Sequence, residues 1–461
     1  MEIGVSHHYN EALEADGAVR EPYGPLMDMM ERLGPGMLAE RRARAGAKLR
    51  ELGATFPLPG DAAAEEERIL PADWIPRIVP REHWTRLSAG LLQRGRAINA
   101  WLTDLQDGEG NVVPQEIVES SRFRDRLRPL PDTAVPHPIH VYGPDVVHLG
   151  NGEYVVLEDN VRVPSGVAYS EAVRQAGRAV MPEVFDAYEV SGIHGYYAKL
   201  RETLRLAAPE GAGDDPNVAI VTGGRADSAF FEHSRIAREC GIGLLTLDEC
   251  RITNGEVLTK ADGRRVDVIY RRLDGGYVVA DLPELEEAYR AGKVGLANAL
   301  GVGVADDKAV FPYVPEMIRT YLGEEPLLPN AHTLSLADPE ARAEALERLP
   351  EMVLKPREGY GGKGVLIGPE ASPENIEEAR RLVQKDPTGF IAQECLDFST
   401  HALDGSSDGS PAEAFVDLRA FVLPAVGYVM PGGLTRVART GTRVVNSSAG
   451  GSFKDTWVLE A

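Results

Sequence analysis

The segment VYGPDVVHLGNGEYVVLEDNVRVPSG (141–166) constrains the fold of this chain more than any other. Two runs rich in β-branched residues are joined by Gly-Asn-Gly-Glu. Because Asn-Gly is the preferred centre of a type I′ turn, the segment predicts a β-hairpin. With Asn151 and Gly152 at its centre, Asp145 lies opposite Glu158, and Asn160 projects from the same face.

This hairpin also predicts a metal site. Two carboxylates directly opposite each other destabilise a hairpin unless a cation compensates their charge. The oxygens of Asp145, Glu158 and Asn160 are ligands that Mg²⁺ uses when it also carries substrate phosphates. The alternative is an acidic hairpin that faces solvent without a metal, and a one-residue bulge would break the pairing.

The segment EMVLKPREGYGGKGVLIG (351–368) is a candidate for phosphate binding. An apolar strand delivers Lys355 and runs into a loop with several glycines. Glycines let backbone N–H groups approach phosphate oxygens closely, and the lysine supplies positive charge. The spacing is neither a Walker A motif nor a dinucleotide fingerprint, and a glycine-rich hairpin without function is the alternative.

A further strand, FIAQECL (390–396), follows about thirty residues later. It is placed to present Gln393 and the backbone of Glu394–Leu396 to the edge of an adenine ring. An ordinary sheet strand is the alternative.

Composition excludes several classes of partner. The 71 Asp and Glu residues against 49 Lys and Arg give a net charge of -22. Such a surface repels nucleic acid and anionic lipid, although a local basic pocket for a nucleotide is still allowed. The three cysteines (Cys240, Cys250 and Cys395) form no C-x-x-C pair, which argues against disulfides and zinc. With no apolar leader and no membrane-spanning run, we expect a cytoplasmic protein.

The 461 residues predict several packed lobes. Apolar residues at helical spacing in Glu31–Leu52 and Trp84–Leu105 predict helices on either side of a Pro-rich stretch. A β-α-β unit is predicted at 217–248, but TGGRAD lacks the third glycine of a dinucleotide site. A helix is predicted to begin at Ser372-Pro373, and the polar stretch 404–411 is expected to be a mobile loop. The predicted domains are a mainly helical N-terminal region (1–130), the metal-binding part (131–205), a Rossmann-like substrate lobe (206–305) and nucleotide-binding lobes (306–461).

Together these segments resemble the circularly permuted ATP-grasp family, which is related to glutathionylspermidine synthetases. The resemblance covers nearly the whole chain, and the order is permuted because the metal hairpin precedes the lysine and the glycine loop. It rests, in addition to the glycine loop and FIAQE, on VVLEDNVRVPSG (155–166), FFEHSRIA (230–237), VDVIYRRLD (266–274), NALGVGVADDK (298–308), VDLRAFV (416–422), GGLTRVA (432–438) and VVNSSAGGSFKDTWVL (444–459). The fold class that it implies is α/β (α+β): a circularly permuted ATP-grasp fold with a helical N-terminal region and a Rossmann-like lobe.

The resemblance implies ATP and Mg²⁺ as cofactors and gives roles to individual residues. The metal ligands are again the three hairpin residues. The residues implied to contact ATP are Lys308, Lys355, Gly361, Gly362, Lys363, Gly364, Gln393, Glu394, Leu396 and Arg419. Arg436 is implied to face the triphosphate with Arg419, and Arg162 to stabilise the transferring phosphoryl group.

The implied activity is an ATP-dependent carboxylate–amine ligase. Phosphoryl transfer to the carboxylate gives an acyl phosphate, which ammonia or a small amine then attacks; positioning and charge neutralisation do most of the work. The carboxylate belongs to an amino acid or a peptide. A phosphotransferase of the same fold and a degenerate nucleotide-binding scaffold are the alternatives. Neither the two substrates nor the oligomeric state follows from the sequence.

The chain departs from the family pattern in three places, and the first two fall in regions expected to form the acceptor pocket. The chain has YNEAL near its amino end, GGYVVADLPEL after Asp274, and SSAGGSF in its last motif. The candidates for the acceptor site are Arg20, Glu232, His233, Arg271 and Arg272, since arginines bind carboxylates bidentately and an acid or a histidine can accept the proton of an amine. Ion pairs at the surface and a buried, hydrogen-bonded histidine are the alternatives.

Overall fold

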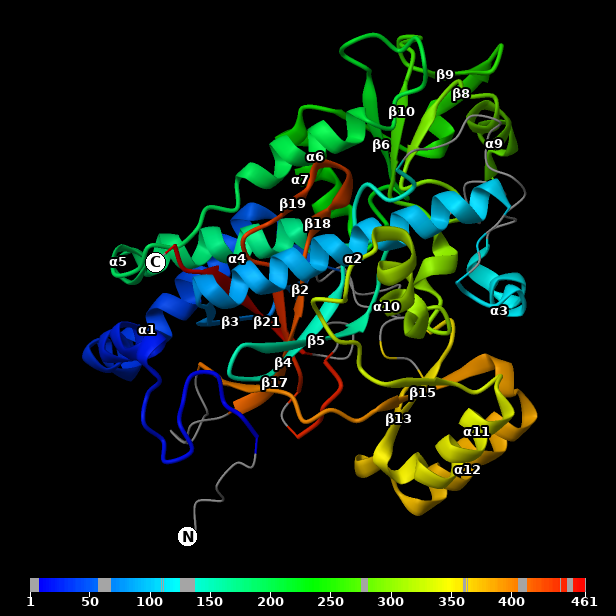
Figure 1. Cartoon of the computed structure of the whole chain (residues 1–461). Helices are drawn as coiled ribbons and strands as arrows, with labels where there is room; N and C mark the ends of the chain where they lie inside the picture. Colours follow the sequence, from blue (N-terminus) through cyan, green and yellow to red (C-terminus); the bar gives the residue numbers. More distant parts are fainter. Residues whose placement is uncertain are drawn as a thin grey trace.

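The computed structural model describes residues 8–56, 68–108, 110, 112–124, 137–274, 281–359, 362, 364–404, 413–439, 441–445 and 451–460. Within these ranges, three sheets of four or more strands organise the chain (Figure 1).

The largest sheet has seven strands and carries the predicted hairpin. Its order is β3-β21-β20-β17-β4-β5, with β16 paired to β17. β3 and β21 are parallel and the other pairs are antiparallel. The strands are β3 (Ala72–Val79), β4 (Asp145–Gly150), β5 (Glu153–Glu158), β16 (Thr400–Ala402), β17 (Glu413–Arg419), β20 (Leu434–Val437) and β21 (Ser452–Val458). The hairpin thus lies beside strands that follow it by more than 250 residues.

Long helices cover this sheet. Both predicted N-terminal helices are confirmed as α1 (Gly24–Leu52) and α2 (Arg81–Asp107), each beginning earlier than expected. Apolar side chains of α2, including Leu91 and Ile98, share a core with Val146 and Val156 of the hairpin. The helix α4 (Val167–Val180) packs against α1 on one side and against β20 and β21 on the other.

The Pro-rich stretch between these helices contains β3, which the sequence did not predict. The strand is buried along most of its length, so its side chains do not alternate between polar and apolar. Its pairing with β21 is irregular between Asp73 and Arg77, and Pro76 lies in this irregularity. A proline is tolerated there because no regular ladder hydrogen bond is required of it.

A parallel sheet in the order β11-β10-β6-β7 forms the Rossmann-like lobe. Val218 and Ile220 of β6 contribute to one core, whereas Ala219 and Val221 contribute to another, as alternation requires of a sheet covered on both faces. The strands are β6 (Val218–Val221), β7 (Gly243–Leu245), β10 (Val268–Arg271) and β11 (Gly295–Ala297), and the covering elements are α6 (Gly195–Arg205), α7 (Phe230–Cys240), α9 (Pro283–Arg290), β8 (Cys250–Thr253) and β9 (Glu256–Thr259). The four domain boundaries stay predictions.

The third sheet is antiparallel and forms a lobe that stands apart from the central sheet, at the lower right of Figure 1. Its order is β12-β15-β13-β14, and we call residues 333–394 the β12–β15 lobe. The helix predicted at Ser372-Pro373 is present as α12, and the Ser372 hydroxyl accepts from the Asn375 amide at 3.3 Å. The elements are β12 (Thr333–Ser335), α11 (Pro339–Arg348), β13 (Met352–Pro356), β14 (Leu366–Ile367), α12 (Pro373–Lys385) and β15 (Phe390–Glu394).

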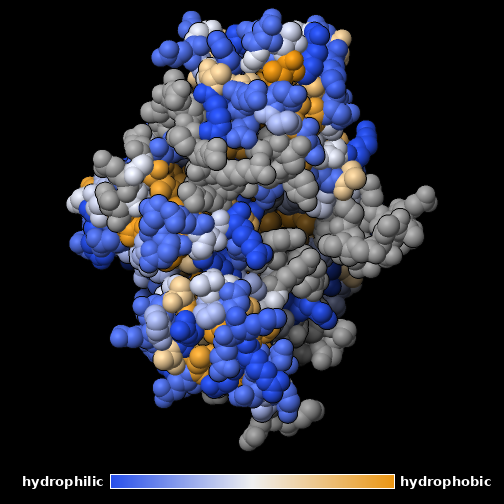
Figure 2. All heavy atoms as spheres, turned by 90° about the vertical axis from the view of Figure 1, so that its right-hand side faces the viewer, coloured by the Kyte–Doolittle hydropathy of each residue, from blue (hydrophilic) through white to orange (hydrophobic). Residues whose placement is uncertain are grey.

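The shorter elements are β1 (Thr55–Phe56), β2 (Arg68–Ile69), α3 (Gln115–Ser120), α5 (Pro182–Asp186), α10 (Val314–Met317), β18 (Val422–Leu423) and β19 (Tyr428–Val429). Across the described ranges, no helix has the length and apolar character to cross a membrane. Figure 2 shows that the side of the molecule bearing the β12–β15 lobe is coloured mostly hydrophilic, with hydrophobic residues in small groups. The predicted mobile loop lies almost entirely outside the described residues.

Candidate active site

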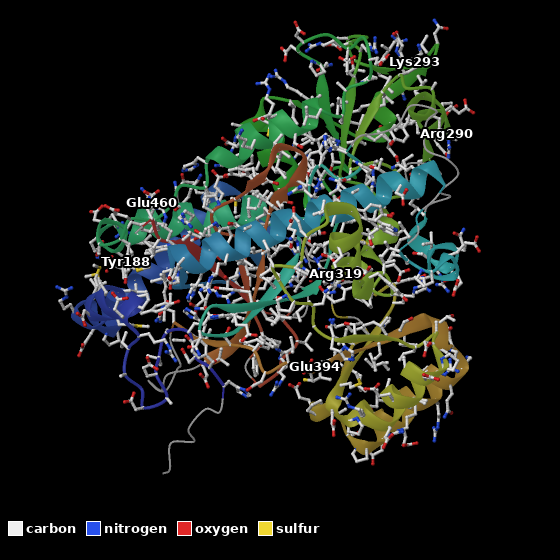
Figure 3. The ribbon with its side chains drawn as sticks, viewed as in Figure 1. Tyr188, Arg290, Lys293, Arg319, Glu394 and Glu460 are labelled. Atoms are coloured by element: carbon white, nitrogen blue, oxygen red, sulfur yellow. The ribbon has the colours of Figure 1, made fainter. Side chains whose placement is uncertain are left out.

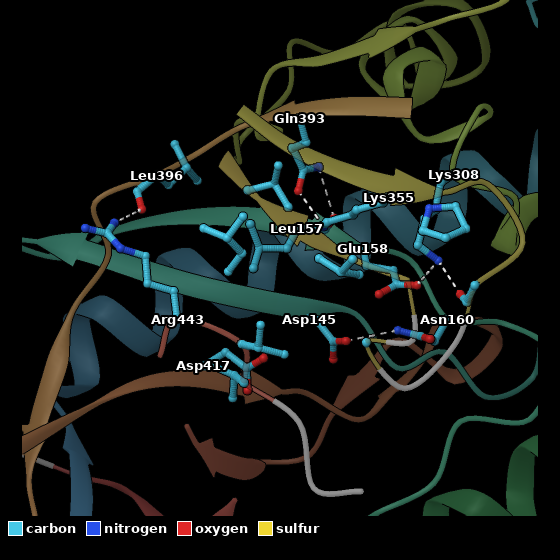
Figure 4. A pocket seen from close by; sticks show the side chains of 18 of the residues that line it. Asp145, Leu157, Glu158, Asn160, Lys308, Lys355, Gln393, Leu396, Asp417 and Arg443 are labelled. Atoms are coloured by element: carbon cyan, nitrogen blue, oxygen red, sulfur yellow. Dashed lines mark hydrogen bonds and ion pairs between the residues drawn. The ribbon is translucent and has the colours of Figure 1, made fainter. Parts of the chain in front are cut away.

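A cleft runs between the β12–β15 lobe and the edge of the central sheet that carries the hairpin. Its empty space, measured out to open solvent, is about 1260 Å³. Figure 4 shows Lys308 and Asn160 at one end, Arg443 and Leu396 at the other, and Leu157 between them. The predicted site residues that line it are Asp145, Glu158, Asn160, Arg162, Lys308, Lys355, Gly362, Gln393, Glu394, Leu396, Arg419 and Arg436.

The hairpin has the predicted turn and the predicted pairing at its functional end. Asn151 and Gly152 have φ of 52° and 77°, as a type I′ turn requires. Asp145 pairs with Glu158, and the Asn160 amide lies 3.4 Å from an Asp145 carboxylate oxygen. Two irregularities interrupt the register, one next to the turn and one between Asp145 and Val146. The second offsets the first, and therefore the two carboxylates still meet.

Two arginines hold the Asp145 carboxylate from the neighbouring strands. Register places Arg419 of β17 directly opposite Asp145, and its guanidinium makes two hydrogen bonds to that carboxylate. Arg436 of β20 lies 2.9 Å from the same group and also pairs with Asp417 at 2.5 Å. Burial opposes ionisation, but the two guanidinium groups outweigh it and lower the pKa of Asp145 to about 2.

Two lysines approach the hairpin from the opposite side. Lys308 Nζ pairs with Glu158 at 2.8 Å and donates to the Gly359 carbonyl at 2.7 Å. Lys355 Nζ donates to the Gln393 side-chain oxygen at 2.6 Å. Burial lowers the pKa of Lys355 to about 8, although the nearby Glu158 opposes this shift. Burial raises the pKa of Glu158, yet Lys308 and other cations bring it below its usual value.

Positive charge is concentrated in the cleft of an otherwise acidic protein. Among the described lining residues, six are basic and five are acidic, against a net charge of -22 for the whole chain. The basic residues are Arg162, Lys308, Lys355, Arg419, Arg436 and Arg443. Such a balance suits a polyphosphate anion whose remaining charge is neutralised by a metal ion.

The far end of the cleft is apolar. Apolar side chains that line the cleft include Val353, Ile367, Phe398 and Val444, and Leu396 packs against the cluster that contains Phe398. Glu394 lies where β15 leaves the lobe, facing the central part of the molecule (Figure 3). A slot of this kind suits a flat heteroaromatic base. Apart from the strand 390–396, the sequence did not reveal this end, because apolar residues in strands look the same whether they line a slot or a core.

The side chain of Gln393 has partners within the protein, and its place at the edge of an adenine ring stays a prediction. Its side-chain amide nitrogen donates to Thr333 at 2.9 Å and to the Leu157 carbonyl at 3.3 Å, while its oxygen accepts from Lys355. The amide therefore orients the lysine and joins the lobe to β5.

The glycine loop is only partly described. Gly362 lines the cleft, and Gly362 and Gly364 have φ of 71° and 74°. A Cβ on Gly364 would lie 2.9 Å from Pro356, so the backbone turns closely around the end of β13. Gly361 and Lys363 lie outside the described residues, and their phosphate contacts stay predictions.

The hairpin oxygens fit a magnesium ion. Asp145 and Glu158 are both ionised at neutral pH, and the side-chain amide of Asn160 lies beside them with its nitrogen toward Asp145, so it would present its oxygen to a cation by rotating the amide. In the part of the chain that the structure describes, no three His, Cys, Asp or Glu side chains cluster in a way that could hold a metal. A cation bound here would therefore draw ligands from Asn160 and from substrate oxygens, as Mg²⁺ commonly does with phosphates.

A buried network that the sequence analysis missed supports the hairpin from behind. Asp159 points away from the cleft, and Arg94 of α2 donates two hydrogen bonds of 2.7 Å to its carboxylate. The Tyr142 hydroxyl donates to the same carboxylate at 2.5 Å, and Arg94 also reaches Asn330. Both charged side chains are 1% exposed.

Arg162 follows the hairpin in sequence and lines the cleft. Its guanidinium donates to Asp306 and Asp274, each at 2.7 Å, and lies 3.8 Å from the centre of the Phe123 ring. The Asp306 carboxylate also accepts from the backbone amides of Val161 and Arg162. These contacts fix the Arg162 guanidinium in the wall of the cleft.

The predicted acceptor residues of the Rossmann-like lobe lie outside this cleft and have internal partners. Glu232 accepts from the amides of Gly166 and Ala168 at the start of α4 and pairs with Arg272 at 3.2 Å. Arg271 donates to three backbone carbonyls, and the buried His233 pairs with Thr222 at 2.8 Å. For His233 the arrangement matches the alternative of a hydrogen-bonded interior histidine.

Arg20 lies in the N-terminal segment. It donates to the Asn10 carbonyl at 2.8 Å and pairs with Glu14 at 2.9 Å. The acceptor role of all five residues stays a prediction, and their contacts do not add support to it.

Comparison with known proteins defines the class. The sequence matches the family described as circularly permuted ATP-grasp type 2 over residues 76–438. The chain belongs to this circularly permuted ATP-grasp family, and the fold class expected from its sequence is thereby confirmed.

Relatives extend the comparison to nearly the whole chain. A Frankia casuarinae protein named "Putative glutamate--cysteine ligase 2-2" is 42% identical, covering 98% of this chain and 53% of that protein. An uncharacterized Synechocystis protein is 40% identical, with 98% and 97% covered. The chain spans about half the length of the Frankia relatives that it matches. A solved glutathione synthetase like-effector from Globodera pallida, in apoform, has a TM-score of 0.59 at 13% identity, covering 92% of this chain and 98% of that one, and shares the fold.

Proposed function

We propose that this protein is an ATP-dependent carboxylate–amine ligase that forms an amide through an acyl phosphate. The observation that carries the proposal is a single cleft in which an apolar slot leads to two lysines and two arginines gathered around paired carboxylates. ATP has a matching arrangement, with an aromatic base at one end and a charged triphosphate at the other.

The comparisons support a ligase over other uses of ATP. The family is ATP-grasp, two Frankia relatives carry the name "Putative glutamate--cysteine ligase", and the fold is shared with a glutathione synthetase like-effector. We therefore propose an amino acid or a peptide as the carboxylate substrate, and ammonia or a small amine as its partner.

The side chains of the cleft would each bind a different part of the Mg-ATP complex. Mg²⁺ held by the oxygens of Asp145, Glu158 and Asn160 would neutralise phosphate charge. Lys308 and Lys355 would bind phosphate oxygens from the lobe side. Fixed donors placed where charge develops stabilise a phosphoryl-transfer transition state without reorganising.

Arginines would complete the site from the sheet side. Arg419 and Arg436 approach the same region as the lysines, and Arg162 lines the same cleft, where it would stabilise the transferring phosphoryl group. The carboxylate oxygen attacks the γ-phosphorus and ADP leaves. The amine then attacks the acyl carbon, and phosphate leaves with the oxygen that came from the carboxylate. A proton passes from the amine to solvent or a nearby base.

Product analysis tests this function. The protein is incubated with Mg-ATP, ammonium, pooled amines, amino acids and short acidic peptides, while phosphorus NMR follows the nucleotide and mass spectrometry follows every carboxylate. We expect ADP, phosphate and a product one water lighter than carboxylate plus amine. A phosphorylated product without amide would identify a phosphotransferase, and AMP with pyrophosphate would rule out the acyl phosphate.

A pair of matched variants tests the role of the hairpin. Glu158→Gln removes a charge from the proposed metal site, and we expect turnover to fall on the order of 100-fold or more because phosphate charge is no longer balanced. Glu153→Gln changes an exposed residue of the same strand and should leave turnover unchanged. Circular dichroism checks that both variants fold, and full activity of Glu158→Gln would exclude the metal role.

A further inference from the structure

A single arginine at the apolar end of the cleft joins three segments that are distant in sequence. Arg443 Nη1 donates to the Leu396 carbonyl at 3.1 Å, directly after β15 (Figure 4). Its backbone amide donates to Glu370 of the β12–β15 lobe at 3.2 Å, and its Nε lies 3.7 Å from the same carboxylate. Its guanidinium also lies 5.0 Å from the centre of the Phe415 ring of β17, in the central sheet.

The lobe is anchored differently at its other end. There Arg357 is buried and binds Asp307 at 2.6 Å, the Ser120 hydroxyl at 2.8 Å and the Ile117 carbonyl at 2.5 Å. Removing one partner of such a buried pair is strongly unfavourable. The Arg443–Glu370 pair is longer and its side chains are 21% and 35% exposed, so water can replace it at little cost. The lobe therefore has one fixed end and one end that can be released.

The segment that carries Arg443 also forms a wall of the cleft. Val444 and Val445 line the apolar slot, and Val353 and Ile367 line it from the lobe. Asp397, which follows strand β15, lies 3.7 Å from Arg443 and also pairs with His8. If Arg443 no longer binds Glu370 and Leu396, the slot loses one of the contacts that join its two sides, and the contact between Gln393 and the Leu157 carbonyl remains.

We propose that Arg443 is a clasp that holds the β12–β15 lobe against the central sheet and closes the base end of the cleft, so that it controls how fast a bound nucleotide leaves. This inference rests on the proposed function for its nucleotide, and on the contacts of Arg443 alone for the clasp. Arg443 is a positioning residue, because it acts through the Leu396 carbonyl and the β12–β15 lobe. The chemistry takes place at the other end of the cleft.

The chain contains its own reporter of this clasp. Cys240 and Cys250 are buried, whereas Cys395 is partly exposed, lines the cleft and lies next to the carbonyl that Arg443 binds. Burial raises the pKa of the Cys395 thiol and Arg443 lowers it, so labelling with a thiol reagent is followed over a range of alkaline pH and compared as the rate of the thiolate form. Opening of the clasp exposes Cys395, and a nucleotide in the slot protects it.

The test compares Arg443→Met with Arg439→Met. Arg439 is an exposed residue four positions earlier, before the same loop, and serves as the matched control. Without nucleotide, we expect the Cys395 labelling rate to rise several-fold in Arg443→Met and to stay unchanged in Arg439→Met. With a non-hydrolysable ATP analogue, we expect the Kd of Arg443→Met to rise roughly 3- to 10-fold, mainly through faster dissociation. Glu370→Gln, which weakens the same link from the lobe side, should change both quantities in the same direction by less.

The possible outcomes separate the clasp from the proposed function. Equal labelling rates and equal analogue affinities in native protein and Arg443→Met would overturn the clasp while leaving nucleotide binding intact. If the native protein bound no adenine nucleotide, the proposed function would be overturned. The labelling rates without nucleotide would still decide whether Arg443 holds the lobe. A changed labelling rate without any change in analogue dissociation would overturn control of nucleotide release.

Discussion

Lys308 and Lys355 reach the same part of the cleft but differ in their partners. Lys308 is neutralised by Glu158, whereas the hydrogen-bond partner of Lys355 is the neutral side chain of Gln393. Burial with an uncharged partner disfavours the ammonium form, which explains why the pKa of Lys355 falls to about 8. The charge of Lys355 is therefore available near neutral pH and is lost in mildly alkaline solution.

This difference predicts a pH-dependent nucleotide affinity. Because phosphate oxygens favour the protonated lysine, the Kd for Mg-ATP should rise as the pH increases through about 8, by on the order of 10-fold once the charged hydrogen bond is lost. Titration calorimetry at several pH values measures this Kd, and above pH 8 binding should also take up a proton. Lys355→Arg keeps its charge throughout this range and should give a flatter profile. A native affinity that does not change across this range would contradict the assignment.

At the scale of single elements, the hairpin shows how a functional pairing survives local irregularity. A strict ladder starting from Asn151 and Gly152 would place every cross-strand pair in one register, but the interior pairs are shifted by one residue. The second irregularity, beside Val146, restores the pairing of Asp145 with Glu158. Bulges of this kind re-aim side chains and are frequent near functional sites.

The network behind the hairpin leads to a prediction about metal affinity. Asp159 stands between two proposed metal ligands, so its hydrogen bonds fix the direction of both neighbours. Tyr142→Phe removes one hydroxyl bond and keeps the Arg94–Asp159 pair, which limits the loss of stability to about 1 kcal/mol. We expect the Mg²⁺ concentration for half-maximal turnover to rise on the order of 10-fold, as is common when a partner of a metal ligand is lost.

The control for this prediction is a tyrosine away from the hairpin. Tyr321 donates its hydroxyl to Asp104 on α2, and Tyr321→Phe should cost similar stability without changing the Mg²⁺ requirement. Thermal melting measures stability in both variants, and Mn²⁺ binding followed by electron paramagnetic resonance measures metal affinity without turnover. An unchanged metal affinity in Tyr142→Phe would show that the network serves folding alone.

For the whole molecule, the sequence predicted those parts whose signal is local. The turn at Asn151 and Gly152, the helix cap at Ser372 and the strand that delivers Lys355 each depend on a few neighbouring residues. The permuted ATP-grasp class followed from motifs spread over the chain. These features gave the fold class and most of the lining of the cleft.

Features that depend on distant residues could not be predicted in the same way. β3 is defined by its pairing with β21, nearly 400 residues later, and its own sequence looks like a proline-rich loop. Arg94 and Asp159 look like ordinary charged residues until the fold buries them together. The buried pair of Glu232 and Arg272 could likewise not be foreseen from the sequence, and the acceptor role of these two residues stays a prediction.

Burial of histidines across the molecule leads to a prediction about stability. His140, His233 and His401 are buried, and burial lowers their pKa values to about 4, 2 and 3, respectively. In the unfolded chain each has a pKa of about 6.5. Below this value the unfolded state binds more protons than the native state, so the stabilising contribution is fully present above pH 6.5 and is lost as the pH falls toward 4.

Urea unfolding between about pH 7.5 and 5 measures the effect before most carboxylates titrate. The free energy of unfolding should fall by up to roughly 4 kcal/mol per pH unit once all three histidines are protonated in the unfolded chain, since each contributes about 1.4. Asp306 and Asp417, whose pKa values burial raises, act in the opposite direction and reduce this slope at the acid end. His83 and His137, whose pKa values burial also lowers, act in the same direction, and His401→Gln should reduce the slope by at most about 1.4 kcal/mol per pH unit. A native unfolding midpoint that stays constant from pH 7.5 to 5 would mean that these histidines bind protons in the folded state, and that the interior around them admits water or rearranges to accept their charge.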